Sequence, residues 1–572
     1  MFSIDEFLYK IKQKLYNDDG MNLTLDKKRK AAMLKNQLTL ILLAAITGVF
    51  SGAVVTIYNV LTAYGEEYSA EWYKGVLANP GFIPLLFLVL AAGAIVIGTA
   101  VKFVPLARGS GIPQIEGAIR GGIVLRWFRT LVTGFAASLA AVFLGLSAGS
   151  EGPSMLVGGC AGCGVGKAGR QGARRTRYLI TGGASAGLAV AFNAPLTGFL
   201  FAFEEAHKKF TPEIFISAFF SVVSGVLTRN GLRLLLGLAD PSITVSPAFQ
   251  AFDLGVIGSF GETWSAMGAV AIGALVAGLL GVGFYYAVLA ARRLFGRMTF
   301  LRSTGKFLIP FMLAGAFGLV SIYEMGGGHR LIEAVGTNGG TADFSVTLNF
   351  AAPVAVALAV VLVMKFIASV CNMGCGVPCG VFVPMLAMGA CAGALVSLAA
   401  QGCGMSAEYS DIVVMVCMAA FFASVVKAPL TGIVMVFELT GSYNFNLLLP
   451  VMLGVAIGYV TGRLLRTEAI YDVLLESFLE TDGVARKGIV ERYTLRIAEG
   501  SPADGREIHD LLLPWSTVIT DIAREGSDGI VPSGVTVLHA GDVLSVRTET
   551  DDRDETFGEL TSVFGKQDTD GS

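Results

Sequence analysis

The stretch that decides the fold occurs twice, as Asn193-Ala-Pro-Leu-Thr-Gly-Phe-Leu-Phe-Ala-Phe-Glu204 and as Lys427-Ala-Pro-Leu-Thr-Gly-Ile-Val-Met-Val-Phe-Glu438. The two copies lie 234 residues apart (428 minus 194). A second related pair precedes them, Gly149-Ser-Glu-Gly-Pro153 and Gly380-Val-Phe-Val-Pro384, at an offset of 231 (380 minus 149). Two halves that share apolar segments broken by Gly and Pro are typical of transporters built from structural repeats, in which the binding site lies where the broken helices meet.

The composition indicates a polytopic membrane protein. Of the 572 residues, 53% are apolar and only 15% are charged, whereas soluble domains carry about 25% charged residues. Mean hydropathy is +0.66. Apolar runs long enough to span a bilayer lie at 38–61, 83–104, 265–291 and 350–370.

Many further apolar segments are short and are cut by Gly or Pro, as at 128–147, 195–206 and 381–401. Irregular backbone at membrane depth is tolerated only where protein buries it or where it lines a wet cavity. The breaks therefore predict a buried polar pathway through an otherwise all-α membrane protein.

The N-terminal segment, residues 1–36, is expected to be cytoplasmic. Lys27-Lys-Arg-Lys30 precedes the first apolar run, and positively charged flanks stay on the cytoplasmic side. Phe7, Leu8, Ile11 and Leu15 fall on one face of a predicted amphipathic helix.

The C-terminal part has a different composition from the apolar body. From 483 to 550, short β-rich segments at 493–497, 518–522 and 543–546 are separated by Gly, Pro, Ser and Asp. This pattern predicts a small α+β cytoplasmic domain, followed by a polar tail over 551–572. A helix is predicted to start at Ser501-Pro502, with Ser as N-cap and Pro at the first helical position.

Three short segments combine glycines with a proline directly before an apolar helix: Gly109-Ser-Gly-Ile-Pro113, Gly149–Pro153 and Gly380–Pro384. Pro suits the first helical turn, where its missing N–H costs no hydrogen bond. The free backbone N–H groups of that turn carry about half a positive charge and bind anions without a fixed cation. Because conduction requires weak binding at several sites, the three segments together predict an anion pathway.

Carboxylates in the apolar segments predict a proton pathway. Glu151 lies inside the second of the three segments, and an intramembrane carboxylate is functional by default. When ionised, it can occupy the anion position, and when protonated it can swing away. Glu204 and Glu205 stand just before His207-Lys-Lys209 at the expected cytoplasmic edge, a suitable place for proton entry. The alternatives are helix capping for Glu151 and interfacial solvation for Glu204 and Glu205.

All eight cysteines lie in the apolar body, for example Cys160 and Cys163. We interpret them as small packing residues because no His or carboxylate at ligand spacing accompanies them. The sequence predicts no metal site, no cofactor and no covalent chemistry, so an enzyme is not expected.

Jointly, these motifs resemble the CLC family of chloride channels and chloride/proton antiporters. The resemblance covers roughly residues 36–478 and rests on GSGIP at 109–113, GxEGP at 149–153, GxFxP at 380–384, NAPLxG…EE at 193–205 and KAPLTG at 427–432. It implies an inverted-repeat architecture over 37–480, with repeats at about 37–240 and 265–466. It also implies a homodimer with one pore per subunit in a prokaryotic plasma membrane, with both termini cytoplasmic.

The resemblance implies roles for individual residues. Glu151 matches the external gating glutamate, and Glu205, with Glu204 beside it, matches the internal proton-transfer glutamate. The anion site implied by the resemblance comprises the hydroxyls of Ser110 and Tyr471, the backbone N–H groups of Val381 and Phe382, and the glycines Gly111 and Gly152. Ser150 departs from the family, which usually has Arg or Lys there, and this is expected to alter the field at the outer mouth.

Residues 485–548 resemble the TrkA C-terminal (RCK-C) domain of bacterial ion-transport regulators. The likeness rests on Ser501-Pro-Ala-Asp-Gly-Arg506 and on Gly541-Asp-Val-Leu544. It implies a sensor for a small ligand such as a nucleotide. The alternative is a dimer clamp without a ligand.

Together, these observations favour chloride/proton exchange, with chloride, protons and the lipid bilayer as partners and no role for nucleic acid. The alternative is a passive, ligand-gated chloride channel with the same pore, and the presence of Glu205 favours exchange. A potassium-handling protein is disfavoured because the sequence contains no Thr-Val-Gly-Tyr-Gly filter.

Overall fold

The computed structural model describes residues 20–239, 264–298, 304–336, 346–441, 447–481, 489–511, 513–514, 517–524, 530–550 and 553–565. The expected amphipathic helix around Phe7 to Leu15 lies outside the described residues. Residues 20–36 form the first part of the long helix α2, so the expected N-terminal segment continues without a break into the first apolar run.

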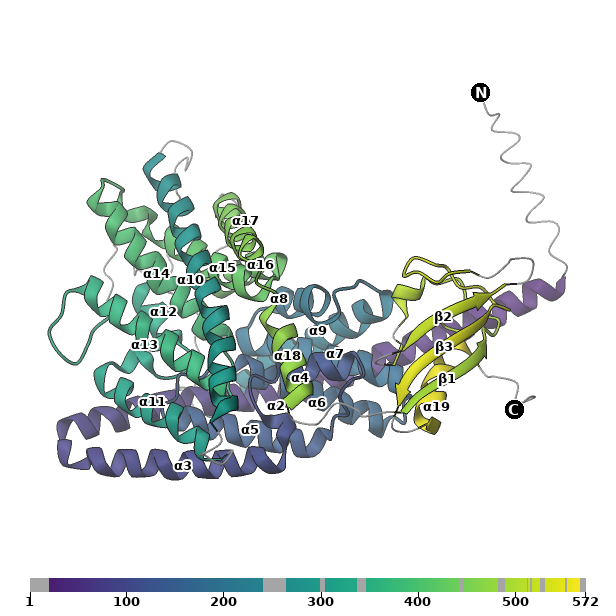
Figure 1. Cartoon of the computed structure of the whole chain (residues 1–572), viewed down its shortest axis with the longest axis horizontal. Helices are drawn as coiled ribbons and strands as arrows, with labels where there is room; N and C mark the ends of the chain where they lie inside the picture. Colours follow the sequence, from purple (N-terminus) through teal and green to yellow (C-terminus); the bar gives the residue numbers. More distant parts are fainter. Residues whose placement is uncertain are drawn as a thin grey trace.

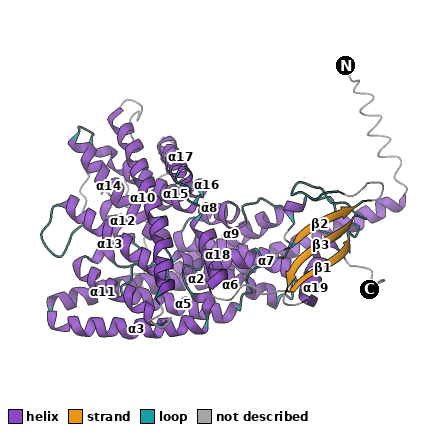
Figure 2. Ribbon diagram, viewed as in Figure 1, coloured by secondary structure: helices purple, strands orange, loops and turns teal. Residues whose placement is uncertain are grey.

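The membrane body is built from helices of very unequal length (Figure 2). The helices of the first half are α2 (Gly20–Ala78), α3 (Ile83–Phe103), α4 (Ile112–Ile119), α5 (Trp127–Phe143), α6 (Glu151–Ala168), α7 (Ala173–Phe192), α8 (Pro195–Phe201), the π-helix η3 (Ala202–His207) and α9 (Pro212–Ala239). The helices of the second half are α10 (Trp264–Arg297), α11 (Leu308–Val320), α12 (His329–Val335), α13 (Val354–Cys375), α14 (Phe382–Gly402), α15 (Ser410–Val426), α16 (Pro429–Thr440), α17 (Leu448–Leu464) and α18 (Ile470–Thr481).

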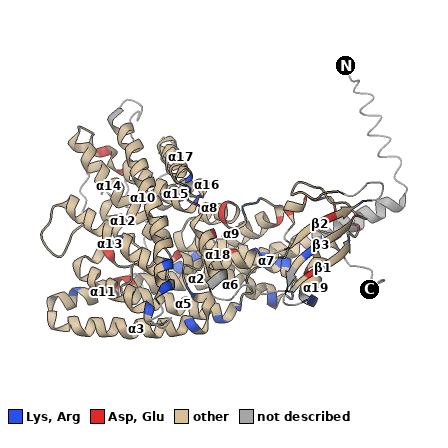
Figure 3. Cartoon of the chain, in the orientation of Figure 1, with Lys and Arg blue, Asp and Glu red and all other residues tan. Residues whose placement is uncertain are grey.

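The predicted polytopic architecture is confirmed. Within the described ranges, seven helices are long and apolar enough to cross a membrane, and four further apolar helices are shorter. α15 is buried along its whole length, whereas α3 exposes large apolar side chains such as Leu88 and Val96. Figure 3 shows a body that is mostly uncharged, with many of the Lys and Arg residues near α5, α7 and the strand domain.

Packing in the second half repeats that of the first half. α6 packs on α7 as α14 packs on α15, α2 packs on α9 as α10 packs on α17, and α5 packs on α6 as α13 packs on α14. In Figure 1, α2 and α3 lie along the long axis, whereas α10, α14 and α17 lie at a steep angle to them. The two repeats are therefore the same packing unit placed in two orientations.

Small residues let neighbouring helices approach closely. A Cβ built on Gly158 of α6 would lie 2.2 Å from the carbonyl oxygen of Gly183 in α7, and a Cβ on Gly183 would lie 2.1 Å from the carbonyl oxygen of Gly158. Small residues at helix interfaces are the usual means of close packing in membranes, where burial of apolar surface against lipid-like neighbours gives little driving force. This explains much of the high glycine content.

The duplicated Ala-Pro-Leu-Thr-Gly sequence forms a reciprocal helix cap. The Glu204 carboxylate accepts hydrogen bonds from the backbone N–H groups of Leu430 (2.8 Å) and Thr431 (2.6 Å), at the start of α16. The Glu438 carboxylate, at the end of α16, accepts from Leu196 N–H (2.9 Å) and Thr197 N–H (2.7 Å), at the start of α8. Each threonine hydroxyl adds a third bond of 2.7 Å to the same carboxylate. Each repeat thus supplies the anion that neutralises the other repeat's helix N-terminus.

The C-terminal domain has a three-stranded antiparallel sheet in the order β1-β3-β2, formed by β1 (Ile489–Arg496), β2 (Val518–Ala523) and β3 (Val543–Thr550). Helix α19 (Arg553–Phe564) packs on it, and Leu560, Val563 and Phe564 join its core. Residues 553–564 are therefore an ordered part of the domain rather than the polar tail expected over 551–572.

The predicted helix start at Ser501-Pro502 is wrong. The segment forms a turn, and the Asp504 carboxylate accepts from the N–H groups of Gly500 and Ala540, both at 2.9 Å. The N–H groups of Ala503 and Gly505 bond to distant carbonyls. Tertiary hydrogen bonds replace the local helical ones, so the Ser-Pro pattern marks a turn here.

We expect Glu438→Ala to lower the free energy of unfolding of the membrane body by about 1–3 kcal/mol, because it leaves the N–H groups of Leu196 and of the buried Thr197 at the start of α8 without acceptors. Glu204→Ala should cost a similar amount at α16. Thermal unfolding of the detergent-purified protein measures both effects. The control is Glu408→Ala, at an exposed position; equal midpoints for Glu438→Ala and this control would contradict the capping role.

Candidate functional site

Two of the three Gly/Pro segments are held together by a pair of backbone hydrogen bonds. Gly149 N–H donates to the Gly380 carbonyl at 2.9 Å, and Gly380 N–H donates to the Gly149 carbonyl at 2.7 Å. α6 begins two residues after Gly149, and α14 begins two residues after Gly380. The first turns of both helices therefore start from one shared point.

The third segment packs against the same point. A Cβ on Gly152 would lie 2.1 Å from the Ser110 carbonyl oxygen and 3.2 Å from the Cα of Gly380. Gly111 has φ of +86°, and a Cβ on it would lie 2.8 Å from the Gly152 carbonyl oxygen. Glycine is needed at both positions, because any side chain would push the starts of α4 and α6 apart.

One hydroxyl without a protein partner lies at this convergence, and another lies on α18, which packs on α4. In the part of the chain that the structure describes, the buried Oγ of Ser110 and the buried phenol oxygen of Tyr471 have no hydrogen-bond partner. A buried polar group left unpaired costs about 1–3 kcal/mol. The charged groups whose fields reach the Tyr471 hydroxyl are the carboxylates of Glu205, Glu116 and Glu151. Both hydroxyls are thus available to a bound anion.

The start of α14 is fixed by aromatic packing. Val381 is its N-cap and Phe382 its first residue, and both are buried. The Phe382 ring lies 4.7 Å from the ring centroid of Phe422 and 5.0 Å from that of Phe192. This packing orients the backbone N–H groups of the first turn without using a charged side chain.

Glu151 lies inside the convergence. Its side chain is 1% exposed, Ser150 Oγ donates to its Oε1 at 3.3 Å, and its buried Oε2 has no hydrogen-bond partner within the described ranges. A Cβ on Gly149 would lie 2.3 Å from that Oε2, and one on Gly380 would lie 3.0 Å from it. The carboxylate therefore rests against the glycine bridge at the N-terminus of its own helix.

Glu205 belongs to a second cluster of charges. It lies in the π-helix η3 and is 1% exposed, and its Oε1 is buried without a partner among the described residues. Glu116 of α4 is equally buried, and the charge of Glu205 is the strongest of the neighbouring charges that act on it. Arg120 lies 3.9 Å from Glu116 and 2.7 Å from Asp472, which also bonds Lys208.

The sequence analysis did not identify Glu116, Arg120 or Asp472. A carboxylate six residues after Ser110, inside an apolar helix, was a recognisable signal for Glu116. Asp472 directly follows Tyr471 in α18, so one helix turn carries both the unpaired phenol and the ion-paired carboxylate. Glu204, expected to support Glu205, points instead to α16 as its cap.

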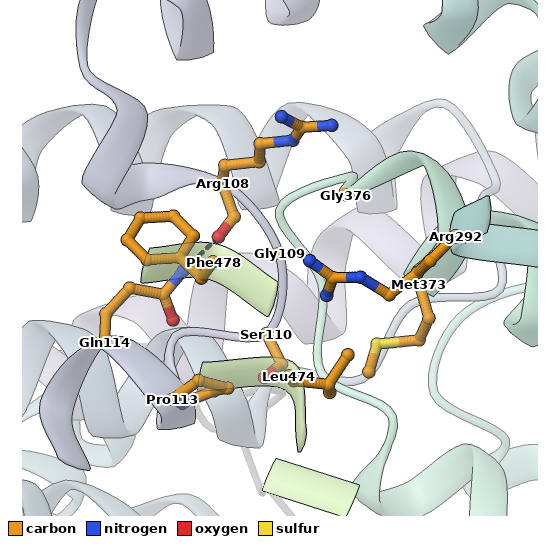
Figure 4. Close-up of a pocket in the computed structure, with 11 residues that line it drawn as sticks. Arg108, Gly109, Ser110, Pro113, Gln114, Arg292, Met373, Gly376, Leu474 and Phe478 are labelled. Carbon is orange, nitrogen blue, oxygen red and sulfur yellow. Dashed lines mark hydrogen bonds between the residues drawn. The ribbon is translucent and has the colours of Figure 1, made fainter. Parts of the chain in front are cut away.

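A pocket with an empty volume of about 400 Å³ opens beside Ser110 (Figure 4). Arg108 and Arg292 both line it, and Leu474 lies next to Ser110 at its base. The Arg108 guanidinium donates to the Cys375 carbonyl at 3.0 Å, and the Gln114 amide bonds the Arg108 carbonyl. Figure 4 shows the Arg108 guanidinium directed away from Ser110, so of these two cationic side chains Arg292 is the one placed to attract anions into the pocket.

The described part of the chain contains no group of three or more His, Cys, Asp or Glu side chains placed to hold a metal ion. Among the described residues, the site instead combines three converging helix starts, two buried hydroxyls without a protein partner and three buried carboxylates.

Comparison with known proteins agrees with this geometry. The sequence matches the voltage gated chloride channel family over residues 92–463 and the TrkA-C domain over 492–560. It is 32% identical over 466 residues to the H(+)/Cl(-) exchange transporter ClcA of Vibrio cholerae, covering 80% of this chain and 93% of the relative. It is 28% identical over 465 residues to the protein of the same name from Cronobacter sakazakii, covering 79% of this chain and 92% of the relative.

Solved structures show the same fold. A slow cyanobacterial Cl-/H+ antiporter superposes with a TM-score of 0.67 at 23% identity, covering 78% of this chain and 99% of that chain. A eukaryotic CLC transporter superposes with a TM-score of 0.61 at 19% identity, and the match covers 83% of this chain and 80% of that chain. With its duplicated helices and converging glycine turns, the chain belongs to the voltage gated chloride channel (CLC) family and carries a TrkA-C domain at its C-terminal end.

Proposed function

We propose that the protein exchanges chloride for protons across the plasma membrane. The observation that carries the proposal is the placement of buried carboxylates around Tyr471: Glu151 at the glycine bridge, and Glu205 at the charged cluster. The names of its relatives as H(+)/Cl(-) exchange transporters support the same conclusion.

Chloride binds where the helix starts converge. The Ser110 and Tyr471 hydroxyls donate to it, and the N–H groups at the start of α14, from Val381 and Phe382, face it as partial positive charges. Gly111 and Gly152 allow the backbones to come close enough to surround the ion. Because no fixed cation contacts the ion, it is held by dipoles and is released readily.

Protons use the carboxylates. Ionised Glu151 takes the place of an anion at the N-terminus of α6, and protonation removes the charge that holds it there. Glu205 exchanges protons with the cytoplasm through η3, where the ion-paired Asp472, Arg120 and Lys208 keep polar groups close to the surface. Glu116 lies beside this path on α4.

The protein acts as a homodimer with cytoplasmic termini. Leu196 and Leu430 occupy equivalent positions at the starts of α8 and α16 and are 58% and 59% exposed. Because the reciprocal cap holds these helices side by side, the two leucines form an apolar surface for a second subunit. The basic residues before the first span, Lys27 to Lys30, place the N-terminus in the cytoplasm.

The TrkA-C domain regulates exchange through its contacts with the membrane body near the charged cluster around Glu205, in response to a small ligand such as a nucleotide. Arg177 of α7, which packs on Gly121 just after α4, pairs with Glu559 of α19 at 2.8 Å. Arg506 pairs with Glu213 at 2.6 Å, and Lys209 bonds the His509 carbonyl. The domain therefore holds both the end of α4 and the segment that follows η3.

We expect Glu151→Gln to abolish proton movement while chloride flux continues, because glutamine is a neutral mimic of the protonated gate. Glu205→Gln should also abolish proton movement. Simultaneous chloride and proton recordings on proteoliposomes measure both fluxes, with the exposed Glu408→Gln as control. A wild-type protein that carries chloride without protons would contradict exchange and favour a passive channel.

We expect Glu559→Gln to weaken the docking of the C-terminal domain, because it removes the charge that pairs with a nearly buried Arg177. Hydrogen bonds to charged groups contribute about 1.5–3 kcal/mol. Hydrogen–deuterium exchange of the full chain should then be faster both in α19 and in residues 202–213.

The control for this docking test is Arg492→Gln, an exposed residue of β1. Faster exchange in α19 with no change over 202–213 would show that the domain does not communicate with the element that carries Glu205.

A further inference from the structure

Glu151 has an ion-pair partner that the functional scheme does not use. His329, the first residue of α12, places its Nε2 3.7 Å from Glu151 Oε1. Among the ion pairs of the described residues, this is the one in which Glu151 takes part. The His329 side chain is 28% exposed, whereas that of Glu151 is 1% exposed. The imidazole therefore spans the distance between solvent and the buried carboxylate.

The loop before His329 is bonded to the loop before Glu151. Ala148 N–H donates to the Gly326 carbonyl at 3.1 Å, and Gly326 N–H donates to the Leu146 carbonyl at 3.0 Å. A Cβ on Gly327 would lie 3.3 Å from the Cα of Gly149. The start of α12 is thus held directly against the glycine bridge on which the gate rests.

Two charged side chains fix this loop in place. The Glu66 carboxylate of α2 accepts from Gly327 N–H at 3.0 Å. The buried Lys365 ammonium of α13 donates to the carbonyls of Glu324 (2.9 Å) and Gly326 (3.0 Å). A buried ammonium used for loop anchoring indicates that the position of α12 is strongly determined. His329 is therefore a placed side chain and not an incidental surface residue.

The charged groups around the imidazole come from each neighbouring element. They are the carboxylates of Glu151 on α6, Glu66 on α2 and Glu333 on α12, together with the ammonium of Lys365 on α13. Histidine is the side chain whose ordinary pKa, about 6.5, allows it to gain and lose a proton near neutral pH. The carboxylate nearest to the His329 imidazole is that of Glu151, which accepts and releases protons in the proposed function.

We infer that His329 is the proton-transfer residue between the external solution and Glu151. Imidazolium gives its Nε2 proton to Glu151 Oε1: the N–H bond breaks, an O–H bond forms, and a neutral imidazole and a neutral carboxyl result. The exposed ring then takes a proton from water, and the reverse sequence releases protons outward. This inference rests on the proposed function, in which Glu151 carries protons.

The placement also compensates for a local absence of charge. Ser150, next to Glu151, provides a hydroxyl at 3.3 Å and no charge. When protonated, His329 supplies a cation on the other side of the same carboxylate. This cation forms as the external pH falls. The same change in external pH therefore both attracts the Glu151 carboxylate toward His329 and supplies the proton that it accepts.

The test compares wild type, His329→Gln and the control Glu333→Gln in proteoliposomes, with external pH stepped between 8 and 5.5. We expect His329→Gln to slow coupled proton transport several-fold, up to the about 100-fold that a positioned acid contributes, and to remove the rise in rate around the imidazole range. Glu333→Gln should keep that rise. Imidazole added to the bath should restore rate to His329→Ala.

The same measurement in the Glu151→Gln background separates transfer from a structural effect. Adding His329→Gln there should leave chloride flux unchanged, because the gate no longer takes protons. A wild-type pH profile in His329→Gln, or an equal loss of chloride flux in both backgrounds, would overturn the inference. If Glu151→Gln itself still moved protons, the proposed function would fail instead.

Discussion

The structure depends on one constraint, which is that a helix beginning inside a membrane has backbone N–H groups that water cannot satisfy. The two repeats solve this for each other. Glu204 bonds the start of α16, and Glu438 bonds the start of α8. At α6 and α14, the segments leading into the helices bond to one another through Gly149 and Gly380. The first-turn N–H groups of those two helices remain for an ion.

This arrangement separates the tasks of the acidic side chains. Glutamates that bond helix starts, such as Glu204 and Glu438, each accept three hydrogen bonds from fixed donors of the other repeat. Glu151 and Glu205 each keep a buried oxygen without a partner in the described structure. In the proposed transport cycle, the carboxylates of the second kind are the ones that carry protons. Adjacent residues in sequence, Glu204 and Glu205, thus have different tasks because successive side chains point to different faces of a helix.

In the proposed cycle, the two carboxylates that carry protons are reached from different parts of the chain. Arg177 and Lys209 link the TrkA-C domain to α7 and to the segment that follows η3, the element that carries Glu205, while His329 lies 3.7 Å from Glu151. The two carboxylates therefore have different neighbours: Glu205 lies in an element next to the segment that the TrkA-C domain contacts, and Glu151 lies beside a histidine. Such a division lets each side of the membrane influence the cycle separately.

The sequence by itself determined the membrane class, the duplicated architecture, the Gly/Pro turns and the positions of Glu151 and Glu205. Each of these depends on hydropathy or on local backbone conformation, and both are set by residues that are close together in the chain. It did not reveal Glu116 with Arg120 and Asp472, the reciprocal caps, the approach of His329 to Glu151, or α19 as part of the domain core. Each of these joins segments far apart in the chain, up to 352 residues for Arg120 and Asp472. Only the tertiary structure decides such contacts, because the residues next to a charged side chain in the sequence do not indicate which distant residue the packing places beside it.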